Sequence, residues 1–186
     1  RALASWEVEA GATYSLVITA CNGLWRYKIG DTVTVTSVNP LKITISGRTK
    51  HFINAFGEEL MVHNADAAIA ATCRELGCEI ANYTAAPVYA ADKTRGRHEW
   101  LIEFSRKPAS IEEFADMLDT KLREVNSDYD AKRTGNIFLD RLSVVEAPAG
   151  LFDRWLASTG KLGGQRKVPR LSNDRHLIEP MLKLMR

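Results

Sequence analysis

The sequence predicts an α+β fold, in which a small antiparallel β unit over residues 1–49 precedes a mixed α+β unit over residues 50–186. Two observations lead to this division. Short runs of β-branched and aromatic residues, separated by turn residues, fill the first part of the chain, whereas helical spacing of apolar residues begins only in the second part. In addition, 186 residues give enough length for one large core or two small ones.

The first unit is expected to hold four short antiparallel strands with turn residues between them. Asn22-Gly23 is a strong turn signal, and Gly30-Asp31 is expected to make a second tight turn. Asn39-Pro40 marks the third connection. The expected strands cover residues 13–20, 25–29, 32–38 and 42–46.

The second unit begins with a predicted helix and a predicted hairpin. The helix covers residues 64–76, with Asn64 as its cap and Gly77 as its stop. Strands over residues 79–92 and 98–104 then flank a polar loop that contains glycine, which is typical of a hairpin.

Another helix is predicted over residues 111–125. Ser110 is a favoured N-cap residue, and Glu112 and Glu113 in the first turn complement the helix dipole. The remaining expected elements are a strand at residues 142–146, a short helix at residues 151–157, and a terminal helix from residue 173 that Pro180 interrupts or bends.

Composition and charge exclude several classes of protein. Lys and Arg number 25 against 23 Asp and Glu, so the net charge of +2 gives no reason to expect nucleic acid or a membrane surface as partner. No apolar run approaches the roughly 18 residues that a membrane-spanning helix needs. We therefore expect neither nucleic acid nor a membrane as partner.

Cysteine and histidine usage favours a reducing compartment and no metal site. The cysteines Cys21, Cys73 and Cys78 include no C-x-x-C pair, so neither a disulfide framework nor a zinc site is indicated. The four histidines also lack the spacing of metal ligands. We expect a cytoplasmic protein, and since the chain opens at Arg1 without a signal-peptide pattern, a piece of a longer one.

The first stretch that suggests chemistry is residues 24–31, which end in Gly30-Asp31. An ionised aspartate only accepts hydrogen bonds and has about four lone-pair sites, so Asp31 could bind two neighbouring hydroxyls, as on a ribose. The alternative is an ordinary hairpin turn, in which Gly-Asp is common.

The second stretch is residues 47–57, where a glycine is followed by two basic residues. Arg48 could hold phosphate or ribose oxygens through two parallel hydrogen bonds, and Lys50 could act as a mobile point charge. A solvated basic loop is the alternative, since most Lys and Arg side chains are simply exposed. Glu58 and Glu59 are expected to be surface charges or, functionally, to attract a cationic amine.

The third stretch, residues 158–170, is rich in glycine and basic residues. Such loops can surround phosphates with backbone N–H groups and bring a lysine to charge that develops during a reaction. The order of residues is not that of a P-loop. A nucleic-acid patch is the competing interpretation, but the run has no interleaved aromatic residues.

The order and spacing of these stretches resemble a known superfamily. Tyr27-Lys28-Ile29-Gly30-Asp31 resembles the Tyr-Arg-Thr-Gly-Asp element of the adenylate-forming enzymes, which include acyl-CoA synthetases and luciferases. Gly47-Arg48, Ile53 and Gly57 follow at the spacing of that superfamily's hinge motif. Together with residues 165–170, they make the whole chain similar to the C-terminal portion of the auxin-responsive (Gretchen Hagen) acyl acid amido synthetases, in a bacterial form.

The resemblance implies a fold and a nucleotide site. Residues 1–49 would be the last β subdomain of a large N-terminal domain that is otherwise missing, and residues 50–186 would be the α+β lid domain of adenylate-forming enzymes. In that family pattern Asp31 would hold the ribose hydroxyls of ATP or the acyl adenylate, Tyr27 would line the nucleotide site, and Arg48 would contact the nucleotide.

The resemblance also implies a moving lid and a catalytic lysine. Lys50 occupies the hinge position, where its backbone would absorb the rotation of the lid. Lys167 resembles the lysine that meets the phosphate groups during adenylation, while Lys161 has the surroundings of the catalytic lysine in acyl-CoA synthetases. The assignment between the two lysines stays open, and Glu58 and Glu59 are candidates for binding the acceptor.

The implied activity is that of an AMP-forming ligase. With ATP, and Mg²⁺ in the full-length enzyme, it would join a carboxylic acid to an amine or amino acid through an acyl adenylate. The chain alone is expected to be inactive, because the upstream phosphate loop and acyl pocket of the family lie outside it. Two alternatives remain: thioester formation with coenzyme A, and a free-standing regulatory domain that binds a nucleotide or a partner.

Overall fold

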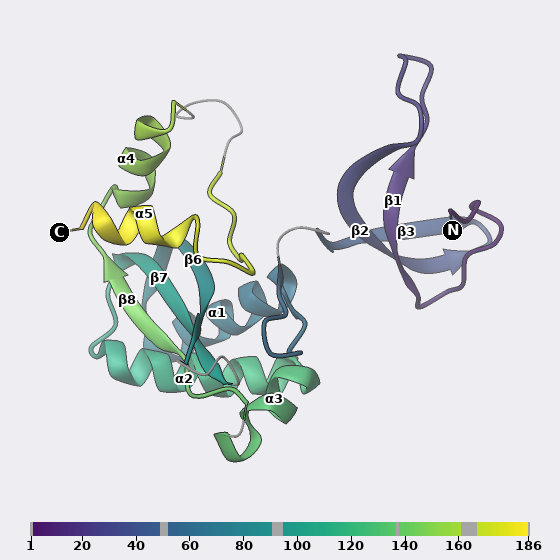
Figure 1. The fold of residues 1–186 in the computed structure, drawn as a ribbon. Helices are drawn as coiled ribbons and strands as arrows, with labels where there is room; N and C mark the ends of the chain where they lie inside the picture. The colour runs from purple at the N-terminus through teal and green to yellow at the C-terminus, as the bar shows by residue number, and fades with distance from the viewer. Residues whose placement is uncertain (1, 49–51, 91–94, 137, 161–166, 186) are drawn as a thin grey trace. The chain divides into compact units, whose positions relative to one another are not determined.

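A computed structural model describes residues 2–48, 52–90, 95–136, 138–160 and 167–185 (Figure 1). The chain divides into two compact units, Arg1–Lys50 and His51–Arg186. Within the described residues, no helix has both the length and the apolar character needed to cross a membrane.

The first unit is one antiparallel sheet of three strands in the order β1-β2-β3. In its described part, Val33 and Val35 are the buried hydrophobic side chains. They lie two residues apart on the central strand and therefore on the same face. The strands are β1 (Thr13–Ile18), β2 (Tyr27–Val38) and β3 (Leu41–Arg48).

The turn expected at Gly30-Asp31 is wrong, because strand β2 runs straight through it. Ser15 pairs with Thr32 and Val17 pairs with Lys28, so β2 advances four residues while β1 advances two. The extra residues form a bulge, in which Gly30 has φ +91°, a conformation that glycine adopts without a steric cost. The four expected strands are consequently three.

The second unit is built on a three-stranded sheet in the order β6-β7-β8, with helices on both faces (Figure 1). Strands β6 and β7 are antiparallel, as the predicted hairpin requires, and β8 runs parallel to β7. The elements are β4 (Phe52–Ile53), β5 (Leu60–Met61), α1 (Val62–Leu76), β6 (Glu79–Tyr89), β7 (Gly96–Arg106), α2 (Ile111–Val125), α3 (Ser127–Arg133), the 3₁₀ turn η1 (Thr134–Asn136), β8 (Ser143–Ala147), α4 (Leu151–Ser158) and α5 (Ile178–Lys183).

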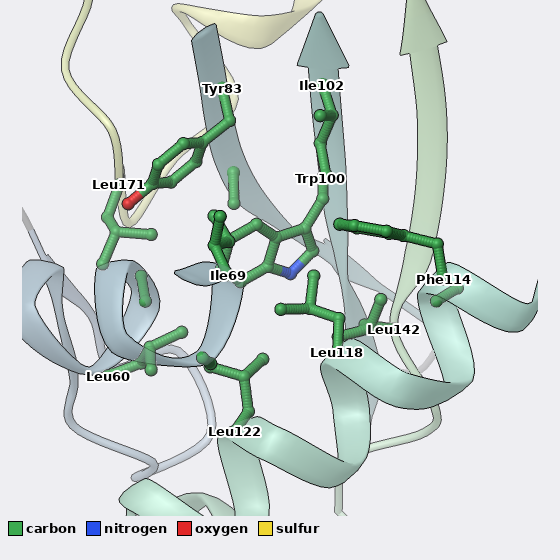
Figure 2. Close-up of a cluster of buried hydrophobic side chains, with 14 of the residues drawn as sticks. Leu60, Ile69, Tyr83, Trp100, Ile102, Phe114, Leu118, Leu122, Leu142 and Leu171 are labelled. Atoms are coloured by element: carbon green, nitrogen blue, oxygen red, sulfur yellow. The ribbon is translucent and has the colours of Figure 1, made fainter. Parts of the chain in front are cut away.

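A large core fills the space between the sheet and helices α1 and α2. Trp100 of β7 is fully buried, and its indole stacks on the Tyr83 ring with centroids 5.6 Å apart. Figure 2 shows the leucines of α2 below this indole and Ile69 of α1 beside it. A smaller core on the opposite face packs Leu101 of β7 against α4 and α5. The alternation of side chains along β7 thus supplies both cores.

Local signals set the ends of several helices as expected. The Ser110 hydroxyl accepts a hydrogen bond from the Glu113 N–H at 3.2 Å, and Gly77 ends α1 in the left-handed conformation. The predicted cap of α1 is displaced: Met61 is the N-cap residue, and Asn64 sits one turn inside, accepting from the Met61 N–H at 3.2 Å.

The terminal helix is shorter than expected. Helix α5 starts at Ile178 rather than near residue 173, and Pro180 falls in its first turn. Proline fits there because backbone N–H groups in the first turn have no partner within the helix. Helix α3 and the short β4–β5 pair were not expected from the sequence.

Candidate functional site

The expected nucleotide-binding residues of the first unit lie on strands β2 and β3. Asp31 of β2 pairs directly with Arg48 of β3 in the antiparallel register. Directly paired positions share one face of a sheet, so these two positions are neighbours although 17 residues separate them in sequence. Tyr27 begins β2 and is half-exposed, with 52% of its surface accessible.

The second unit contains a cavity of about 360 Å³ beside Lys167. Its walls come from α1, from the first half of β6 and from α4, with residues 167–170 along one side. Apolar side chains, among them Ile69 and Phe152, form part of the lining. The polar lining includes both signs of charge: Asp66, Asp153, Lys167 and Arg170.

A polar cluster on one side of this cavity joins three elements of the chain. The Tyr83 hydroxyl of β6 donates to Asp66 Oδ1 of α1 at 2.7 Å, and Arg170 Nη1 forms an ion pair with the same oxygen. The guanidinium carbon of Arg170 lies 5.3 Å from the centre of the Tyr83 ring. Burial, together with the hydrogen bond to the Asp66 carboxylate, raises the pKa of the Tyr83 hydroxyl well above its ordinary value.

The surface position expected of Glu58 is wrong, because this carboxylate is fully buried. It accepts hydrogen bonds from the backbone N–H groups of Ala55 and Phe56 at 3.2 and 2.7 Å. Its Oε1 also lies 2.7 Å from Nε2 of His98, which is equally buried. Burial alone would raise the pKa of Glu58, but the His98 contact and the backbone N–H groups stabilise the charged form and hold this pKa below its ordinary value.

Glu59 differs from its neighbour in being exposed. It has φ +40°, unusual for a residue with a side chain, and its N–H donates to the Asn54 side-chain oxygen at 3.3 Å. The two adjacent glutamates thus have separate environments, one inside the fold and one at its surface.

For three candidate residues the structure gives little or no information. Lys50 and Lys161 lie outside the described residues, so the hinge and the second candidate lysine keep their status as sequence-based hypotheses. Arg48 is described through its strand pairing.

The described residues contain no group of three or more His, Cys, Asp or Glu side chains that could hold a metal ion.

The partners of Arg170 and Glu58 in the second unit could not be read from the sequence. Asp66 lies 104 positions before Arg170, and His98 lies 40 positions after Glu58. No local pattern signals contacts at such separations. The one available signal was the change of sign in charge between α1 and the basic segment near residue 170.

Two protein-family models match the chain. The GH3 family central domain matches residues 1–48, and the GH3 family C-terminal domain matches residues 63–176. A search of curated proteins gave no match.

Among solved structures, the chain is similar to a GH3.15 acyl acid amido synthetase, with a TM-score of 0.75 and 18% sequence identity. It is also similar to the AtGH3.15 acyl acid amido synthetase in complex with 2,4-DB, with a TM-score of 0.71 and 17% identity. Each comparison covers 97% of this chain and 34% of the solved chain. The likeness shows a shared fold, and this chain spans about a third of the length of those structures.

Proposed function

This chain belongs to the GH3 family, matching its central and C-terminal domain models in that order, and from this premise we propose that it works within an ATP-dependent acyl acid amido synthetase. The family resemblance seen in the sequence is confirmed by these matches. The observation that carries the proposal is that two domains of one enzyme family follow each other along a single chain.

The proposed reaction has two steps. In the first, a carboxylate oxygen bonds to the α-phosphorus of ATP and pyrophosphate leaves, which gives an acyl adenylate. In the second, the nitrogen of an amine or amino acid bonds to the acyl carbon, AMP leaves and one proton is released. Mg²⁺ would enter with the ATP phosphates, where it neutralises charge.

In the first unit, we assign the nucleotide to strands β2 and β3. Asp31 would accept hydrogen bonds from the ribose hydroxyls, and Arg48 would contact the nucleotide from the paired position on β3. Tyr27, at the start of β2 and half-exposed, would offer an aromatic wall. The direct pairing of Asp31 with Arg48 supports this assignment.

In the second unit, we assign the adenylation lysine to Lys167 and keep Lys161 as the alternative. Lys167 is exposed beside a cavity large enough for a phosphate group, so its ammonium can meet charge that builds on departing pyrophosphate. Rotation of the lid about Lys50 would then withdraw Lys167 before the acceptor arrives. For binding a cationic acceptor, Glu59 is the exposed candidate, while the buried Glu58 would act by supporting the loop that carries it.

The test measures acid-dependent exchange of labelled pyrophosphate into ATP with the complete protein that contains this chain. Asp31→Ala and Lys167→Ala are each expected to lower the exchange rate at least ~10²-fold, the scale for losing a preorganised charge. Lys107→Ala is the matched control, because Lys107 pairs at the surface with Glu146 at 2.5 Å. Exchange at the wild-type rate in both site variants would refute the site assignment.

Product analysis separates the proposed amide chemistry from its rivals. With hydroxylamine or amino acids as acceptor, we expect a hydroxamate or an amide together with AMP. A thioester with coenzyme A and no amide would assign the chain to the acyl-CoA synthetase type of reaction. Nucleotide binding without any exchange in the complete protein would favour a regulatory domain.

A further inference from the structure

We propose that Asp66, Tyr83 and Arg170 form a clamp that positions Lys167 for adenylation. The proposal rests on the proposed role of Lys167 and adds three positioning residues to it. Below, the segment formed by residues 167–172 is called the strap. Within the strap, Leu171 forms a parallel β-bridge with Ala85 of strand β6.

The clamp holds the strap through its Arg170 side chain. Asp66 Oδ1 accepts from both Arg170 Nη1 and the Tyr83 hydroxyl, so one carboxylate oxygen ties helix α1, strand β6 and the strap together. The Arg170 guanidinium also lies over the Tyr83 ring. A planar cation held by a carboxylate on one side and an aromatic face on another has little freedom to reorient.

Backbone hydrogen bonds fix the strap at the same place. The Ala85 N–H donates to the Arg170 carbonyl at 2.9 Å, and the Ser172 N–H donates to the Ala85 carbonyl at 3.1 Å. The Thr84 hydroxyl adds a bond to the Pro169 carbonyl at 2.8 Å. Residues 169–172 are therefore held on β6 by backbone hydrogen bonds to Ala85 and by the side-chain hydroxyl of Thr84.

Lys167 stands three residues before Arg170 and lines the same cavity as Arg170, Asp66 and Tyr83. A chain of three residues spans about 10 Å at most, so fixing Arg170 restricts where the Lys167 backbone can lie. The clamp thus sets the starting point from which the lysine ammonium reaches the phosphates. Misplacement by about 1 Å is enough to cost up to ~10²-fold in rate.

The exposure of the clamp argues for positioning rather than for global stability. The Arg170 and Asp66 side chains are 48% and 42% exposed. Ion pairs this accessible to solvent contribute little to folding stability. Removing the pair should leave the fold nearly as stable as before and change chiefly the placement of the strap.

The experiment combines clamp variants with the lysine variant in the complete protein. We expect Asp66→Asn to lower the maximal rate of acid-dependent pyrophosphate exchange about 10-fold or more, with the thermal midpoint within about 3 °C of the wild type. Tyr83→Phe removes a single hydroxyl and keeps the ring, so it provides a milder second variant. Glu124→Gln is the matched control, because it neutralises an exposed carboxylate that pairs with Lys121 and does not line the cavity.

A double-mutant cycle distinguishes a role in positioning Lys167 from a merely structural role of the clamp. If the clamp acts through the lysine, Asp66→Asn should change exchange less than about twofold in a Lys167→Ala background. Equal effects of Asp66→Asn in both backgrounds would overturn the clamp, as would wild-type exchange in both Asp66→Asn and Tyr83→Phe. Wild-type exchange in Lys167→Ala would instead overturn the proposed role of the lysine itself.

Discussion

The two units of the chain differ in how many of their hydrophobic side chains are buried. In the second unit, His51–Arg186, the sheet is covered on both faces and contributes to two separate hydrophobic cores. In the described part of the first unit, only Val33 and Val35 are buried among the hydrophobic residues. Its remaining large apolar side chains are largely exposed, including Trp6 at 85% and Trp25 at 79%.

The difference shows that a regular strand ladder is not the same as a stable fold. Strands β1–β3 form a paired ladder with local bulges, yet few of their apolar side chains are buried. Folding costs about 1–2 kcal/mol of conformational entropy for every residue that is ordered. Burial of a valine side chain contributes about 1.5–3 kcal/mol, and only a few side chains of this unit are buried. The second unit meets this cost from its own cores, and the first unit does not.

The largest expected effect comes from separating the units. We expect residues 51–186 alone to give dispersed amide resonances and a cooperative thermal transition, because both cores lie within them. Residues 1–50 alone should give the narrow spectrum of a chain without fixed tertiary structure. A cooperative transition in the isolated first unit would remove the contrast between the two.

A smaller effect is expected from truncating one tryptophan in each unit. Trp100→Ala should lower the free energy of unfolding by about 3–5 kcal/mol, because it empties the centre of the larger core (Figure 2). Trp25→Ala should change it by less than about 0.5 kcal/mol. Urea denaturation of the whole chain measures both, and similar losses in the two variants would contradict the comparison.

The next effect concerns charge buried within the second unit. Asp119 accepts from the Tyr129 hydroxyl at 2.6 Å and from Arg133 Nη2 at 2.8 Å, and it is 6% exposed. Asp119→Asn should cost about 3 kcal/mol of unfolding free energy, because Arg133 would keep a buried charge without its counter-charge. The control is Glu79→Gln, whose pair with Arg106 is exposed and worth at most about 1 kcal/mol.

The smallest effect is a change in acid sensitivity. Because the pKa of Glu58 is lower in the fold than its ordinary value of 4.5, the unfolded chain binds more protons near that pH. The stabilisation is complete above the unfolded value and is lost as the pH falls through the folded value. Glu58→Gln should therefore flatten the loss of thermal stability below about pH 5. Identical acid profiles in wild type and Glu58→Gln would contradict this.

Local chemistry made much of the fold predictable from the sequence. The cap at Ser110, the stop at Gly77 and the β6–β7 hairpin depend on residues within a few positions of each other. The failures also have a physical reason: Gly30-Asp31 suits a turn, yet the same positive φ suits a bulge inside a long strand. Only the neighbouring strands decide between the two.

The candidate site was less predictable than the fold. Its charged residues could be proposed from motifs, and the register does pair Asp31 with Arg48. The environment of each residue could not be predicted. The contact of Glu58 with His98 and the ion pair of Arg170 with Asp66 both join segments that are far apart in the sequence. Sequence patterns indicated which side chains could react, whereas tertiary packing decides which of them are free to do so.

The two backbone hydrogen bonds between Ala85 and the strap have a consequence for solubility. Strand β6 is the outermost strand of its sheet, and an unpaired edge can recruit a strand from another molecule. At Ala85 the outward N–H and carbonyl are already used by Arg170 and Ser172. The strap therefore caps this part of the edge, and a variant that releases it would expose a template for self-association between copies of the protein.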